Sequence, residues 1–162
     1  MAKKPNLQKR VTLLSVLCAI LAVAAVVFGA MALESGNDQA NEMAAWSRTA
    51  ARDAAEAFSA YSDDAKDYLY TAAVADFNHF LCLFAQVHGE DMQAEHLMMN
   101  EVYERFLIMP SISKTWIPVL VHALEILSVD LTNAHAHEEM LNIRNALAQG
   151  HAATTEDLTH SH

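Results

Sequence analysis

The stretch Val11–Leu33 reads VTLLSVLCAILAVAAVVFGAMAL and contains 23 consecutive residues without a charged side chain. With a rise of about 1.5 Å per residue, a helix of this length extends roughly 35 Å, enough to cross a hydrocarbon layer of about 30 Å with some tilt. Four basic residues come directly before it, namely Lys3, Lys4, Lys9 and Arg10. The sequence therefore predicts a transmembrane helix over residues 11–33 after a basic N-terminus, residues 1–10.

The charges that flank this stretch predict its orientation. Short cytoplasmic flanks are rich in Lys and Arg, whereas the far flank here begins with Glu34 and Asp38. We therefore expect a single-pass protein of the cell membrane, with its N-terminus in the cytoplasm and its C-terminal domain outside it. Secretion after cleavage following Ala32 is the alternative, because residues 30–32 (AMA) fit a signal-peptidase site. The apolar stretch exceeds the usual signal core of about 7 to 15 residues, which favours an anchor.

The part of the chain after the anchor is strongly acidic. Six of the ten basic residues and all 20 acidic residues follow residue 33, so this part has a formal net charge of −14. The length of this part suits one domain that buries a hydrophobic core. Because such a charge repels phosphate groups, we expect no nucleic-acid partner. We also expect the domain to keep away from anionic lipid headgroups, or to bind a basic protein or cations.

The exported part has few glycines and prolines, and it lacks the alternation that strands require, which predicts an all-α fold. Helix caps and breakers divide residues 34–150 into an extracytoplasmic four-helix bundle. The polar tail, residues 151–162, lacks periodicity and is expected to be disordered. The predicted helices cover residues 39–61, 62–89, 90 to about 110, and, after a loop at 110–114, residues 115–150.

The fourth predicted helix carries a heptad pattern typical of a coiled coil. Its apolar positions recur at intervals of four and three residues from His122 to Leu147. Leucines make its first half apolar almost all round, so the second half is free to present its seam to a partner or to a second copy of the chain. A polar Asn133 within the seam would set register and partner number. The predicted interaction seam consists of Asn133, Ala136, Met140, Ile143 and Leu147.

Two alternatives remain open for this region. The alanine-rich helix over residues 39–61 could instead cover the seam within one chain, since small side chains allow close helix packing. Residues 116–129 could form a second membrane span. That stretch is short for a span and contains His122 and Glu125, so a buried helix is favoured.

Several histidines lie near carboxylates at helical spacing, which indicates a possible metal site. Four-helix bundles hold two metal ions between inward-facing carboxylate and imidazole groups. The match is partial, because such bundles use Glu-x-x-His on two helices, and polar residues at the bundle edges are the simpler interpretation. A stripe of Met92, His96, Met99 and Tyr103 would suit copper. The candidate metal ligands are Asp76, His79, Glu95, His96, His122 and Glu125.

Motifs for common catalytic chemistry are missing from the sequence. It contains no Cys-x-x-Cys-His, no glycine-rich phosphate loop and no nucleophile elbow. We therefore predict no enzymatic activity and no cofactor. The predicted function is that of a non-catalytic protein-interaction or sensory module, anchored in a bacterial envelope and able to self-associate. The alternative is a bundle that binds transition-metal ions, as a di-metal or a copper site.

Overall fold

The computed structural model describes residues 36–61 and 67–159. The predicted anchor over residues 11–33 and the basic N-terminus lie outside these ranges. Within them, no single helix is both long and apolar enough to cross a membrane. One pair of helices, Gln93–Ile108 and Pro110–Leu127, meets the length and composition requirements together but is bent by 112°.

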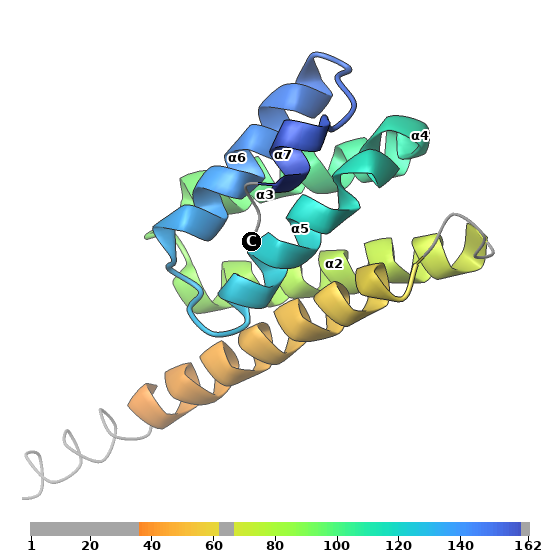
Figure 1. Cartoon of the computed structure of the whole chain (residues 1–162). Helices are drawn as coiled ribbons and strands as arrows, with labels where there is room; N and C mark the ends of the chain where they lie inside the picture. The colour runs from red at the N-terminus through yellow and green to blue at the C-terminus, as the bar shows by residue number, and fades with distance from the viewer. Residues whose placement is uncertain (1–35, 62–66, 160–162) are drawn as a thin grey trace, which may run out of the picture. The chain divides into compact units, whose positions relative to one another are not determined.

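The described residues form helices joined by turns and contain no strand, which confirms the all-α prediction (Figure 1). Glu42–His162 forms one compact unit. The elements in chain order are a helix over residues 36–59, α2 (Asp67–His88), α3 (Gln93–Ile108), α4 (Pro110–Ser113), the 3₁₀ turn η1 (Lys114–Trp116), α5 (Ile117–Leu127), α6 (Ala134–Ala148) and α7 (Thr155–Thr159).

The core of this unit forms where α2 packs on α3, α3 on α6, and α6 on α5. Phe58, near the end of the helix over residues 36–59, is fully buried and meets Phe77 of α2 and Phe106 of α3 edge to face, with ring centroids 6.4 and 5.6 Å apart. Such aromatic pairs add to the stabilisation that burial alone provides. The four alanines buried in this helix lie on the same core: Ala50, Ala51, Ala54 and Ala55.

The end of α3 depends on a proline. The carbonyl of Phe106 would normally accept a hydrogen bond from the amide of residue 110, but Pro110 has no N–H. The hydroxyl of Tyr70, on α2, donates to this carbonyl instead at 2.8 Å. As predicted, the third helix stops near Pro110. The predicted loop over residues 110–114 is wrong, because that segment forms α4 and the start of η1.

The prediction of one continuous helix over residues 115–150 is also wrong. Helix α5 ends at Leu127, and α6 begins only at Ala134. In the turn between them, Asp130 Oδ1 accepts hydrogen bonds from the backbone N–H and the hydroxyl of Thr132 at 3.0 and 2.8 Å. These bonds, the hydroxyl one above all, lower the pKa of Asp130. The two helices pack against each other as a hairpin instead of forming a rod (Figure 1).

This break changes the interpretation of the heptad pattern. Asn133 lies in no seam: its side chain caps α6 by accepting hydrogen bonds from two backbone N–H groups, at 3.1 and 3.2 Å. Val129, which falls in the heptad register that starts at His122, is 79% exposed. The other predicted seam residues are buried in the core of this same chain, so the seam is interior: Ala136, Met140, Ile143 and Leu147.

The C-terminal segment is docked on the domain, so the prediction of a disordered tail is wrong for residues 151–159. The indole N–H of Trp116 donates to the backbone carbonyl of His151 at 2.9 Å, and the backbone N–H of Ala153 donates to the Thr115 hydroxyl at 2.9 Å. Beyond these bonds, α7 lies against α5, and Leu158 packs on the core.

Candidate metal centre

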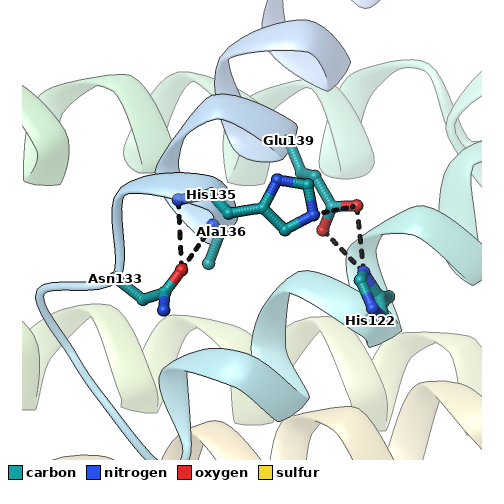
Figure 2. A network of polar contacts seen from close by, with 5 residues as sticks. All are labelled: His122, Asn133, His135, Ala136 and Glu139. Carbon is teal, nitrogen blue, oxygen red and sulfur yellow. Dashed lines mark hydrogen bonds and ion pairs between the residues drawn. The ribbon is translucent and has the colours of Figure 1, made fainter. Parts of the chain in front are cut away.

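Two elements bring three potential metal ligands together (Figure 2). His122 lies on α5, whereas His135 and Glu139 lie in the first turns of α6. Residues four apart share one face of a helix, so His135 and Glu139 point the same way. The cap at Asn133 fixes the start of α6, and the hairpin turns this face toward α5.

The carboxylate of Glu139 is the centre of this group. Nδ1 of His122 is 2.9 Å from both of its oxygens, and Nε2 of His135 is 3.7 Å from Oε1. The two imidazole rings are 6.0 Å apart at their centroids and nearly perpendicular, at 77°. One ligand atom from each of the three residues lies within 4.8 Å of the other two.

Burial of the charged Glu139 carboxylate costs free energy, because the group loses its contact with water. The side chain of Glu139 is 9% exposed, whereas those of His122 and His135 are 27% and 57% exposed. A carboxylate removed from water needs a hydrogen-bond partner and compensation for its charge. Within the described part of the chain, Glu139 has these two histidines, and no Lys or Arg, within 4.0 Å of its carboxylate oxygens. A neutral imidazole donates a hydrogen bond but no charge, so a cation bound by all three residues would complete the compensation.

A pocket of about 270 Å³ adjoins the group. His135 and Glu139 form part of its wall, so two of the three potential ligands face it. Three of its lining side chains are carboxylates, and none is a Lys or Arg. The remaining wall comes from η1, from both helices of the hairpin and from α7. The complete lining is Trp116, Val119, His135, Glu138, Glu139, Asn142 and Asp157.

Of the six ligands predicted from the sequence, only His122 belongs to this group. Across residues 36–61 and 67–159, no other set of three or more His, Cys, Asp or Glu side chains has comparable geometry. The predicted di-metal arrangement is therefore not assembled among the described residues. In the copper stripe, Met99 is fully buried in the apolar core. Asp76, Glu95 and His96 are half-buried on α2 and α3, and His79 and Glu125 are exposed.

The sequence interpretation missed His135 and Glu139 because it extended one helix through the turn. On a continuous helix, His122 and Glu139 would be separated by roughly 26 Å, at 1.5 Å per residue. The signal for the break was the cluster of turn-forming residues from Asp130 to Asn133. Once the break is recognised, the four-residue spacing of His135 and Glu139 marks them as neighbours.

A second pair of histidines lies near Phe84. The ring of His88 is 4.6 Å and that of His137 is 6.0 Å from the Phe84 ring, between centroids. His137 Nε2 is 3.0 Å from the Leu131 carbonyl, whereas Nδ1 of His137 and Nε2 of His88 are buried without a hydrogen-bond partner. Burial, and secondarily the nearby His137, lowers the pKa of His88.

No protein-family model, no curated protein and no solved structure matches this chain.

Proposed function

We propose that this protein is a membrane-anchored helical domain, exposed outside the cytoplasm, that binds one transition-metal ion through His122, His135 and Glu139. The anchor and its orientation rest on the sequence of residues 1–38. The observation that supports metal binding is the buried Glu139 carboxylate, with an imidazole nitrogen 2.9 Å away and a second at 3.7 Å. The acidic character of the exported part favours the approach of a cation.

Zinc fits the donor set best. Imidazole and carboxylate are common Zn²⁺ ligands, and three protein ligands of the His₂Glu type occur in zinc sites that keep a further position open. Two donors that each lie about 2.0–2.1 Å from a tetrahedral Zn²⁺ are roughly 3.3 Å apart. The two separations from Glu139, 2.9 and 3.7 Å, bracket this value, and all three ligand atoms lie within 4.8 Å of one another, so the group would contract around the ion. Because the group contains no sulfur ligand, it suits Zn²⁺ better than Cu⁺.

The interaction module predicted from the sequence has less support as the main function. Its seam was the specific argument for self-association, and the seam residues from Ala136 to Leu147 face the interior of the domain. The acidic charge and the anchor are compatible with a basic protein partner but do not identify one. Absence of enzymatic activity stays a prediction.

Metal analysis of the full-length chain in detergent tests the proposal. After treatment with EDTA and titration with Zn²⁺, calorimetry should give one tight site per chain. Glu139→Gln keeps the size of the side chain but removes the charge, so we expect zinc affinity to fall at least about tenfold, a loss of about 1.4 kcal/mol. His79→Ala is the matched control, since this exposed histidine lies outside the group. Equal zinc binding by wild type and Glu139→Gln would overturn the proposal.

A further inference from the structure

We infer that the bound metal ion keeps a coordination position open toward the adjoining pocket and accepts there a neutral nitrogen donor from outside, of the imidazole or small-amine class. This inference rests on the proposed metal site and extends it to the chemistry of a ligand. His135 and Glu139 belong both to the metal group and to the wall of the pocket, so a bound ion would lie beside this pocket.

The group supplies three ligand atoms, and no other described His, Cys, Asp or Glu of the pocket wall belongs to it. Oδ2 of Asp157 accepts hydrogen bonds from the backbone N–H and hydroxyl of Thr154, at 2.7 and 2.6 Å. The indole N–H of Trp116 donates to the His151 carbonyl. Val119 is apolar, and neither Glu138 nor Asp157 falls within the group of potential ligands. A tetrahedral ion would therefore present its fourth position to the pocket.

The charge of the pocket selects the kind of ligand. Glu138, Glu139 and Asp157 line it without a Lys or Arg among the described lining residues. Carboxylates that line the pocket disfavour the entry of anions such as carboxylate, phosphate or azide. A neutral imidazole or amine carries a nitrogen lone pair to the ion without this repulsion.

The size and shape of the pocket limit the ligand to one side chain or a molecule of that size. Its volume of about 270 Å³ lies below that of pockets for drug-sized ligands, which start at roughly 300 Å³. Trp116 and Val119 provide apolar wall against which a flat ring can pack. The imidazole could come from a free small molecule or from a histidine side chain of another protein, and the two sources share the same coordination chemistry.

Cobalt substitution in the full-length chain tests the inference. Co²⁺ occupies zinc sites and has a visible spectrum that changes with its ligands. We expect imidazole and N-acetylhistidine amide, the latter as a model of a protein side chain, to shift the spectrum to saturation, whereas azide at the same concentrations leaves it unchanged. A response to imidazole but not to the larger compound would assign the free small molecule as the source.

Two variants change the pocket without changing the three ligands. Asn142→Trp adds bulk at an exposed lining position, so we expect Co²⁺ to bind normally and imidazole to bind at least about tenfold more weakly, a loss of about 1.4 kcal/mol. Glu138→Lys replaces a lining carboxylate with a cation, so azide should now alter the spectrum. Circular dichroism checks the helical content of both variants.

The outcomes separate the two proposals. If Co²⁺ fails to bind to the wild-type chain, the proposed metal function falls, and the inference with it. If Co²⁺ binds but imidazole leaves its spectrum unchanged, or azide binds equally well, the inference is overturned while the metal function stands. Undiminished imidazole binding by a folded Asn142→Trp chain would also overturn it, because the ligand would then reach the ion by another route.

Discussion

His122 and Glu139 are 17 positions apart in the sequence, yet Nδ1 of His122 lies 2.9 Å from both carboxylate oxygens of Glu139. The contact joins the two helices of a hairpin and involves a carboxylate that is 9% exposed. It gives the metal-free domain a polar link between α5 and α6, and it places two potential ligands in position before an ion arrives.

His122→Ala should destabilise the metal-free protein. Loss of the imidazole leaves a buried carboxylate short of a partner, which costs about 1–3 kcal/mol. Urea unfolding of the full-length chain in EDTA, followed by circular dichroism, measures the difference. His79→Ala, at an exposed position on α2, should stay within about 0.5 kcal/mol of wild type. An unchanged urea midpoint for His122→Ala would mean that the contact between His122 and Glu139 does not stabilise the hairpin.

Zinc should raise the melting temperature of the wild-type chain but not of Glu139→Gln. An ion that binds only the folded state stabilises it by about 2.7 kcal/mol when its free concentration is about 100 times the dissociation constant. Differential scanning calorimetry with and without Zn²⁺ measures this. A comparable rise for Glu139→Gln would place the stabilising ion elsewhere on the chain.

Asn133→Ala should cost about 1 kcal/mol, because it removes the cap that accepts hydrogen bonds from the N–H groups of His135 and Ala136. Asn133→Asp keeps an acceptor at the helix N-terminus and should unfold near the wild-type midpoint. Asn133→Leu distinguishes the cap from the predicted seam: it destabilises a cap, whereas it would stabilise an apolar seam. Urea midpoints of the three variants settle the comparison.

Tyr70→Phe should destabilise the domain by about 1–3 kcal/mol, because the Phe106 carbonyl then loses a donor that Pro110 cannot replace. The pKa of the Tyr70 hydroxyl is raised, chiefly by burial and also by the neighbouring Tyr61. Tyr61→Phe is a control at a neighbouring, less buried tyrosine, and it leaves the bond from Tyr70 to Phe106 in place. If both variants unfold at the same midpoint, the bond contributes nothing measurable.

The metal-free domain should lose stability in mild acid through His88. Its pKa is lowered in the folded state from the ordinary value of 6.5, by burial first and by His137 second, while Asp91 and Glu95 act in the opposite sense. The folded state therefore binds the proton less readily than the unfolded chain. The stabilising contribution is complete above pH 6.5 and is lost as the pH falls below it toward the lower folded pKa.

This pH dependence can be measured with one variant and one control. Between about pH 7.5 and about pH 5, the melting temperature of His88→Gln should fall less than that of the wild type, both in EDTA. His79→Gln, an exposed histidine on the same helix, should keep the wild-type fall. Equal falls for wild type and His88→Gln would exclude His88 as the source of the acid sensitivity.

The sequence allowed the prediction of the helical class and of most helix ends, because Gly89, Pro110 and Gly150 are strong local breakers. It did not allow the prediction of the hairpin, because apolar residues on both sides of the turn happen to continue one heptad register. Positions that face a common core from two antiparallel helices can mimic the stripe of a single long helix. His122 was recognised as a candidate ligand, but its partners depended on this tertiary turn and could not be identified by spacing along one helix.

The docked C-terminal segment has a practical consequence for anyone who expresses this protein. Only three residues would separate a polyhistidine purification tag fused after His162 from Thr159, the end of α7, whose Asp157 lines the pocket beside the metal group. The imidazoles of the tag belong to the ligand class inferred for that pocket and, at so short a tether, would be present at high effective concentration. The imidazoles of the tag would compete with an external ligand for the ion and mask the binding of that ligand. An affinity tag without histidine is therefore preferable.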